Sequence, residues 1–217
     1  MGNLFSFQVS ERRSMKIDKK RAIRIITDAA KQYDSDLKNF QFLIVYQEKG
    51  VQKYTELGFR DMHFLHLTGV KSRLSAQRFY EACLNRKLAE NDIEIDSKGK
   101  VEQKLQVLPY LSELLYHNCM IGDFLDSGVM IRADYFVGDT KMILSVGFRY
   151  GPGLDIPVTL FRGDIRKLTS PTNKVIAIFR RAYPNQIYDT ATYVSQGIHI
   201  SELDIPDGLV KIAKQSD

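Results

Sequence analysis

The order of apolar and polar residues predicts a helix and then a hairpin in the first part of the chain. From Met15 to Tyr33, apolar residues recur at helical spacing with basic residues between them, which indicates one amphipathic helix. Residues 39–47 (NFQFLIVYQ) predict a strand, 48–50 a turn, and 51–59 a returning strand.

Two further helices are predicted in the middle of the chain. Ser75 is a suitable N-cap for a helix whose apolar face ends near Leu84. Residues 90–100 are polar and predict a loop with a short extended piece. A leucine stripe over 101–117 predicts the next helix, with a kink or break at Pro109 because proline removes a helical hydrogen bond.

The last part of the chain predicts an antiparallel sheet. Its four strands are expected at residues 129–137, 141–149, 158–163 and 174–183, and residues 186–194 are a further strand or an ordered tail. The fold class is therefore α+β, with N-terminal helices and a β-hairpin followed by a four-stranded antiparallel sheet. We expect a loose leader over 1–14, one domain over 15–200, and a C-terminal tail or short helix over 201–217.

Composition indicates a globular protein rather than a disordered or membrane-spanning one. Of the 217 residues, 44% are hydrophobic and 26% charged. No apolar run reaches the ~18 residues that a membrane-spanning helix requires. The N-terminus lacks the apolar core of a secretory signal. Cys83 and Cys119 lie far apart with no CxxC partner, so we expect two buried thiols in a reducing, cytoplasmic setting.

The net charge of +5 is concentrated near the N-terminus. Residues 10–24 contain seven lysines and arginines against Glu11 and Asp18, which equals the whole surplus. Such a segment binds phosphates or an anionic membrane surface, or is simply a solvated helix face. The first residues, MGNLFS, match the myristoylation pattern, but nothing else indicates a lipidated protein, and we do not predict membrane anchoring through Gly2.

The stretch HFLHLTGV (63–70) places two histidines among apolar residues. Its flanks indicate extended chain, in which His63 and His66 would face opposite sides, and no nearby residue completes a ligand set. We therefore predict no metal and no cofactor. The glycines between Gly147 and Gly153 match no phosphate-binding pattern and indicate a turn between strands.

Cleavage of RNA through its own 2′-hydroxyl requires a base, an acid and cations, and needs no nucleophile from the protein. Histidine, lysine, arginine and tyrosine on a rigid sheet supply these groups. The residues of these types that could converge are His66, Lys104, Arg149, Arg180, Arg181 and Tyr188. Most proteins of this size contain such residues, so the inventory alone defines no site.

Spaced blocks between Met15 and Tyr193 make a more specific case. They are HLTGV (66–70), LSAQRFYEACL (74–84), KLQVLPYL (104–111), MIGDF (120–124), PVTLFRGDIRKLT (157–169), KVIAIFRRAY (174–183) and IYDTATY (187–193). With these blocks the chain resembles the fourth subgroup of phage-associated nucleases grouped with barnase, EndoU, colicin E5/D and RelE. The resemblance implies helices leading into a four-stranded antiparallel sheet that carries the active site. The hairpin at 39–59 is extra to that minimal core.

The resemblance also implies roles for individual residues. His66 is the expected general base or acid, and Lys104, Arg180 and Tyr188 are expected to hold the phosphate and stabilise the transition state. Thr68 and Arg181, which lie within the blocks, are expected substrate-binding residues, with Thr68 orienting substrate or His66. Arg149 lies outside the blocks and is expected to bind substrate on its chemistry alone. His63 is expected to face solvent or pack. The alternatives are a His66 that satisfies a buried hydrogen bond and an Arg180 that protects a strand edge.

Two functions follow from these observations. The first is a metal-independent endoribonuclease acting as a toxin or as a phage or mobile-element defence effector, with RNA as substrate and an antitoxin or immunity protein as partner. The second is a catalytically inactive RNA-binding or protein-interaction module on the same fold. A shared cleft containing His66, Lys104, Arg180 and Tyr188 would favour the enzyme.

Overall fold

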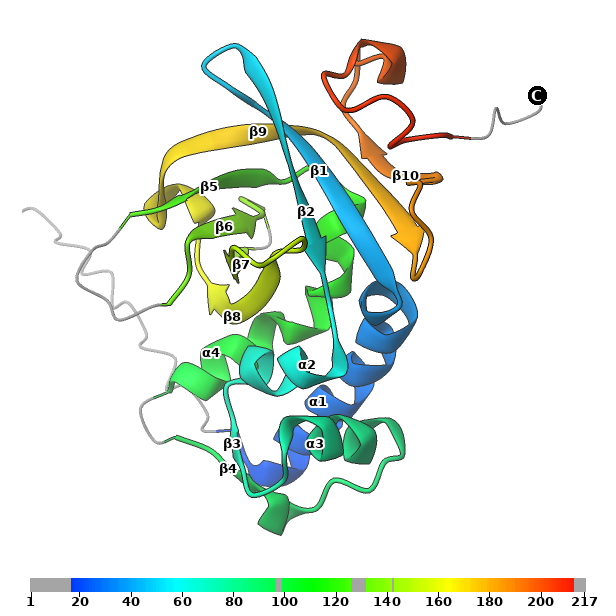
Figure 1. The fold of residues 1–217 in the computed structure, drawn as a ribbon. Coiled ribbons are helices and arrows are strands. Elements are labelled where there is room, and N and C mark those ends of the chain that lie inside the picture. Colours follow the sequence, from blue (N-terminus) through cyan, green and yellow to red (C-terminus); the bar gives the residue numbers. More distant parts are fainter. Residues whose placement is uncertain (1–16, 97–98, 126–131, 142, 213–217) are drawn as a thin grey trace, which may run out of the picture.

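Helices gather at one end of a strongly curled antiparallel sheet (Figure 1). The computed structural model describes residues 17–96, 99–125, 132–141 and 143–212. The leader predicted at 1–14 and the first part of the strand predicted at 129–137 lie outside these residues.

Four helices form the base of the molecule. They are α1 (Lys19–Tyr33), α2 (Asp61–Thr68), α3 (Ala76–Leu84) and α4 (Lys100–Val107). The predicted cap of α3 is confirmed, because the Ser75 hydroxyl accepts a hydrogen bond from the Arg78 N–H at 3.4 Å. The predicted break at Pro109 is also confirmed: α4 ends at Val107, and two 3₁₀ segments, Leu108–Tyr110 and Ser112–Tyr116, follow.

Helix α2 corrects the prediction of extended chain at HFLHLTGV. Its buried residues are His63, Phe64, Leu67 and Thr68, a set that repeats every three to four positions and so follows the helical period. Gly69 ends the helix at a φ of 76°, a left-handed conformation that glycine adopts without steric cost. The apolar letters of a helix this short resemble those of a buried strand, and burial against α3 and β8 decides between them.

The strands are more numerous than the pattern predicted. They are β1 (Phe40–Glu48), β2 (Val51–Gly58), β3 (Lys71–Ser72), β4 (Ile93–Glu94), β5 (Met120–Phe124), β6 (Tyr135–Gly138), β7 (Leu144–Arg149), β8 (Ile156–Arg162), β9 (Thr169–Ala182) and β10 (Thr190–Val194). The predicted hairpin at 39–59 is confirmed as β1 and β2, and the strand considered at 186–194 is confirmed as β10.

The α+β class is confirmed, whereas the four-stranded sheet is wrong: eight strands form one sheet. Its order is β2-β1-β9-β5-β6-β7-β8, and β10 pairs with β9 beside this path. The hairpin is not an addition at the margin, because β1 pairs with β9 over residues 174–182. The long strand β9 therefore connects the hairpin to β5 and to the strands predicted from the sequence.

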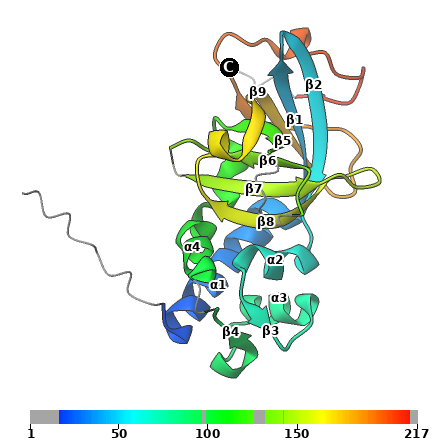
Figure 2. The same ribbon diagram turned by 90° about the vertical axis from the view of Figure 1, so that its left-hand side faces the viewer.

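The two ends of the sheet approach each other at the base of the hairpin (Figure 2). The Gly58 N–H donates to the Asp155 carbonyl at 3.0 Å, and the Asp155 N–H donates to the Glu56 carbonyl at 2.8 Å. This short parallel contact joins the start of β8 to the end of β2. It curls the sheet into an incomplete barrel that stays open beside the upper part of β2.

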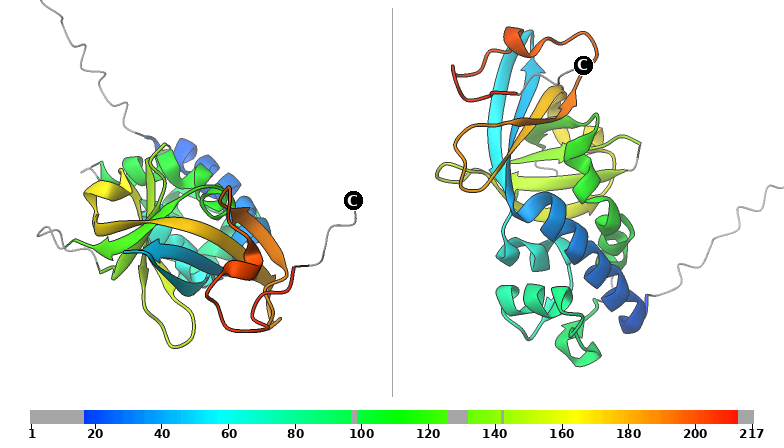
Figure 3. Two further views of the ribbon diagram at one scale, coloured as in Figure 1. Left: turned by 90° about the horizontal axis from the view of Figure 1, so that it is seen from above. Right: turned by 90° about the vertical axis from the view of Figure 1, so that its right-hand side faces the viewer.

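Apolar residues cover both faces of the central strands. The main core lies between the inner face of the sheet and the helices, and includes Phe42, Leu57 and Ile178. On the opposite face of β1 and β9, residues 194–212 cover a second cluster that contains Phe179 and Tyr188 (Figure 3). This covering segment contains one 3₁₀ turn, Ile200–Glu202, and no α-helix up to residue 212. The end of the region predicted as a tail or short helix, residues 213–217, lies outside the described residues.

None of the helices in the described ranges is long and apolar enough to cross a membrane.

Candidate functional site

Two of the predicted catalytic residues meet where α2, α4 and β8 join. The Lys104 ammonium donates one hydrogen bond to the backbone carbonyl of His66 and one to the hydroxyl of Thr159, each at 3.2 Å. The His66 side chain is exposed at the same end of α2. An exposed imidazole cannot be satisfying a buried hydrogen bond, so that alternative for His66 is wrong.

The surroundings of Lys104 make its ammonium a stronger acid than that of an ordinary lysine. Burial of the amine, assisted by the positive charge of Lys100, lowers the pKa of Lys104 from 10.5 to about 8. Its stem lies against the backbone of Gly69, where a Cβ atom would come within 2.6 Å of the lysine Cδ. The glycine thus ends α2 and leaves the space through which the lysine reaches the helix end.

Thr68 supports this helix end from inside the protein. Its hydroxyl donates to the Leu65 carbonyl at 2.7 Å and accepts from the Val70 N–H at 3.3 Å, and its exposed fraction is 0%. A buried hydroxyl with both functions occupied by backbone does not face a substrate. The geometry favours the other role considered for Thr68, which is holding the segment that carries His66.

Arg180 and Arg181 are neighbours on β9 and point to opposite faces of the sheet. The Arg180 guanidinium lies 4.3 Å from the Phe40 ring centroid and donates to the Tyr116 hydroxyl at 2.7 Å. Its Nε is buried and has no hydrogen-bond partner among the described residues. Arg180 therefore lies over aromatic rings beneath the sheet, away from Lys104.

Arg181 and Tyr188 form a polar network on the other face of β9. The Tyr188 hydroxyl donates to the Glu56 carboxylate at 2.7 Å, and Arg181 forms an ion pair with the same carboxylate at 3.2 Å. Arg181 also donates to the side chain of Gln41 at 2.7 Å. Burial, and next the hydrogen bond to Glu56, raise the pKa of Tyr188, which keeps its proton on the phenol.

The expected common cleft does not form. Arg149 is exposed at the end of β7 opposite Ile156, separate from both groups around β9. The structure brings the Lys104 ammonium to the backbone carbonyl of His66. Arg149 and Arg180 lie elsewhere, and Arg181 and Tyr188 lie together at Glu56. Register and facing direction decide this outcome, and neither can be read from the spacing of residues along the chain.

His63 packs inside the protein on α2, which confirms the second of the two expectations for it, solvent exposure or packing. It is 8% exposed, and its Nδ1 accepts a hydrogen bond from the Arg60 N–H at 3.2 Å. Burial, with the charges of Arg60 and His66, lowers the pKa of His63 from 6.5 to about 4. In the residues that the structure describes, no group of three or more histidines, cysteines or carboxylates is placed to hold a metal ion.

Acid should destabilise the fold through His63. The folded state keeps the ring neutral down to about pH 4, whereas an unfolded chain binds the proton near 6.5. The contribution of His63 to the free energy of unfolding is therefore complete above pH 6.5. About 2 kcal/mol of it is lost as the pH falls from 6.5 to about 4, after allowance for partial exposure.

Urea denaturation at pH 7 and pH 4.5 measures this loss of free energy of unfolding. His63→Asn, which keeps an acceptor for Arg60, should flatten the dependence; an equally steep dependence in this variant would contradict the assignment.

A second polar cluster, which the sequence did not reveal, lies where the curled sheet opens. We call it the mouth cluster: Tyr46, Glu48, Lys53, Thr55, Asp123, Tyr135, Tyr150 and Asp155. Tyr135 and Thr55 donate to the same Asp155 oxygen at 2.8 and 2.6 Å, and Glu48 pairs with Lys53. Its members come from four strands and a loop. The polar end of β1, YQE after an apolar run, is the one local signal of it in the sequence.

The molecule is an α+β protein with a curled antiparallel sheet, and at its helical end the Lys104 ammonium contacts the backbone carbonyl of His66. The family described as phage-Barnase-EndoU-ColicinE5/D-RelE like nuclease4 matches residues 25–197, and the chain belongs to this family. The resemblance expected from the spaced blocks is thereby confirmed. No curated protein and no solved structure matches the chain.

Proposed function

We propose that the protein is a metal-independent endoribonuclease that cleaves RNA at the junction of α2, α4 and β8, and that it acts in the cytoplasm as a toxin or as a phage or mobile-element defence effector. The observation that carries the proposal is Lys104. Its amine is sheltered, has a pKa of about 8, and is held by the carbonyl end of the helix that presents His66. Family membership supports the nuclease class.

The two side chains suit the two proton transfers of the reaction. A neutral imidazole at His66 takes the proton from the 2′-hydroxyl, and the 2′-oxygen then attacks phosphorus to form a 2′,3′-cyclic phosphate. The Lys104 ammonium gives a proton to the departing 5′-oxygen. Imidazole is the commonest general base in enzymes, and an amine with a pKa of about 8 remains mostly protonated at pH 7 while releasing its proton readily.

The charges near Lys104 suit a phosphodiester. Lys100 is close enough to affect its pKa, and no ion pair between Lys104 and a carboxylate exists in the described part of the chain. Two of the three N–H groups of the ammonium are occupied by His66 and Thr159, which leaves one for a phosphate oxygen. Arg180, Arg181 and Tyr188 have partners elsewhere and are not part of the proposed machinery. An antitoxin or immunity protein is the partner that a toxin of this kind requires.

The test is incubation of the purified protein with total RNA and with tRNA in the presence of a chelator. Wild type is expected to produce fragments with 2′,3′-cyclic phosphate ends, and His66→Gln is expected to lose at least about a hundredfold in rate. His199→Gln removes a different exposed histidine and should cleave normally.

Two outcomes would overturn the proposal. Absence of cleavage over a range of pH, with RNA still bound, would favour the inactive RNA-binding module instead. Cleavage that His66→Gln leaves unchanged would place the chemistry elsewhere in the fold.

A further inference from the structure

The upper part of β2 is an unpaired edge of the sheet. Because Glu56 and Gly58 bond to Asp155, their N–H and C=O groups point away from β1. The direction of the backbone N–H and C=O groups alternates from one residue to the next along a strand. Because the pairing of β1 with β2 has no bulge, the N–H and C=O groups of Gln52 and Tyr54 also point away from β1. Within the described ranges neither residue has a backbone partner on that side.

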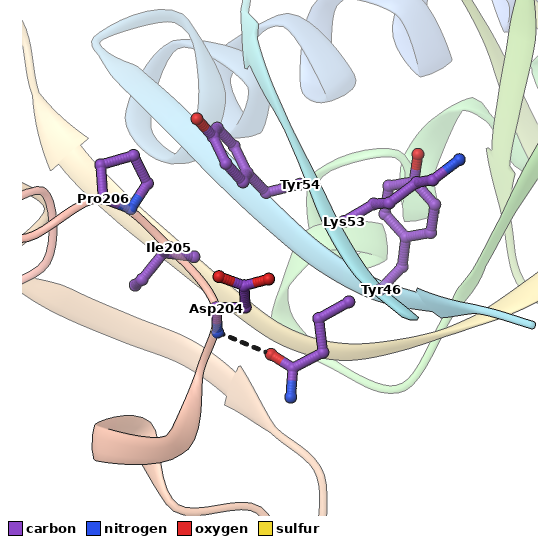
Figure 4. Close-up of a pocket in the computed structure, with 7 residues that line it drawn as sticks. Tyr46, Lys53, Tyr54, Asp204, Ile205 and Pro206 are labelled. Atoms are coloured by element: carbon purple, nitrogen blue, oxygen red, sulfur yellow. Dashed lines mark hydrogen bonds between the residues drawn. The ribbon is translucent and has the colours of Figure 1, made fainter. Parts of the chain in front are cut away.

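A groove runs along this edge. Its volume is about 550 Å³, and it is lined by Tyr46, Gln52, Lys53, Tyr54, Asp204, Ile205 and Pro206. Figure 4 shows Tyr46 and Lys53 on one side of β2, with Tyr54, Ile205 and Pro206 on the other. The Asp204 N–H donates to the Gln52 side chain at 2.8 Å, which fixes the outer wall next to the strand.

The two walls of the groove differ in chemistry. The outer wall combines the apolar surfaces of Tyr54, Ile205 and Pro206 with the carboxylate of Asp204, and Tyr54 there is 42% exposed. The inner wall belongs to the mouth cluster. Burial raises the pKa of Tyr46; among the charges around its phenol, Lys53 lowers this pKa, and the carboxylates of Glu48, Asp123 and Asp155 raise it. Glu48 forms an ion pair with Lys53, and the carboxylates of Asp123 and Asp155 then give this wall a net negative charge.

We propose that the free edge of β2 binds an extended segment of a partner protein in which basic and apolar residues alternate. A strand added to this edge would receive hydrogen bonds from Gln52 and Tyr54. Its side chains would point alternately inward and outward. Basic side chains would then lie beside Asp123 and Asp155, and apolar ones would lie against Tyr54 and Pro206.

The charge of the mouth cluster argues against other occupants. Carboxylates repel the phosphates of RNA, and a second copy of this chain would bring an identical acidic edge. A lysine on an edge strand normally discourages pairing with another strand. Here the charge of Lys53 is neutralised by its ion pair with Glu48. The proposal does not depend on the nuclease activity, because the α2–α4–β8 junction lies at the other end of the sheet (Figure 1).

The test uses three short capped peptides and titration calorimetry with the full chain. One alternates lysine with valine, the second alternates glutamate with valine, and the third has the lysines and valines in separate blocks. We expect the first to bind at least about tenfold more tightly than the others. Tyr54→Pro removes an outward N–H that takes no part in the hairpin and should weaken binding about tenfold, whereas Tyr54→Ala keeps that N–H.

Asp123→Asn should reduce binding of the lysine peptide severalfold and reduce its dependence on salt. The urea midpoint of each variant verifies that it is folded. Equal binding of the three peptides, or binding that Tyr54→Pro does not weaken relative to Tyr54→Ala, would overturn the proposal. Concentration-dependent dimerisation abolished by Tyr54→Pro would assign the edge to a second copy and would equally overturn it.

Discussion

Replacing Lys104 with methionine is expected to lower the rate of RNA cleavage by a factor of about 10² to 10⁴. This is the range typical for removal of a general acid. Methionine keeps the apolar stem that packs against Gly69, so the fold should be preserved while the amine that binds the His66 carbonyl is lost. Single-turnover cleavage of a short RNA, with the protein in excess, measures the chemical step without product release.

The pH dependence separates an acid from a simple cation. If Lys104 donates the proton, the wild-type rate should fall as the pH rises above about 8, where the ammonium deprotonates. Lys104→Arg keeps the charge but holds its proton throughout, so a low rate without a fall above pH 8 is expected. Lys100→Met is the control for charge alone and should weaken RNA binding with little effect on the cleavage step. Full activity of Lys104→Arg at pH 9 would exclude proton donation by Lys104.

Replacing Glu56 with alanine is expected to destabilise the protein by about 3 kcal/mol. The substitution leaves the Arg181 guanidinium and the Tyr188 hydroxyl without their shared carboxylate, and uncompensated charge in a sheltered site is costly. Tyr188→Phe removes one hydrogen bond and should cost about 1 kcal/mol. Urea denaturation measures both changes in the free energy of unfolding.

The matched control is Glu113→Ala, at an exposed glutamate, which should change stability by less than about 0.5 kcal/mol. If Glu56→Ala were no more costly than this control, the network would not be a stabilising element. Tyr188→Phe has a second use, because the residue is 0% exposed and lies on the far face of β9. Its RNA cleavage should equal that of wild type; a hundredfold loss would restore Tyr188 as a catalytic candidate.

Much of the fold could be predicted from periodicity. The helix α1 and the hairpin of β1 and β2 have long, regular patterns, and their burial in the structure follows those patterns. Strand β5 was missed because MIGDF has few β-branched residues and contains a glycine. That glycine lies against the Pro171 carbonyl, where a Cβ would come within 2.3 Å, so the strand depends on a neighbour distant in sequence.

The candidate site was predictable only where one local element contributes most of it. His66 and Gly69 belong to one helix end. Lys104 lies in a separate block of the resemblance, and the structure shows that its ammonium binds the His66 carbonyl. Arg180 and Arg181 could not be assigned to faces before the register of β9 was known. The mouth cluster was beyond prediction for a related reason: Thr55 and Asp155 are a hundred positions apart and meet only because the sheet curls.

The placement of β1 between β2 and β9 has a consequence for synthesis on the ribosome. The hairpin can form as soon as residue 58 has emerged, but the second edge of β1 has no partner until residue 182 follows. Contacts between segments so far apart also slow folding. The nascent chain therefore cannot complete its sheet before residue 182 has emerged, and until then one edge of β1 stays unpaired.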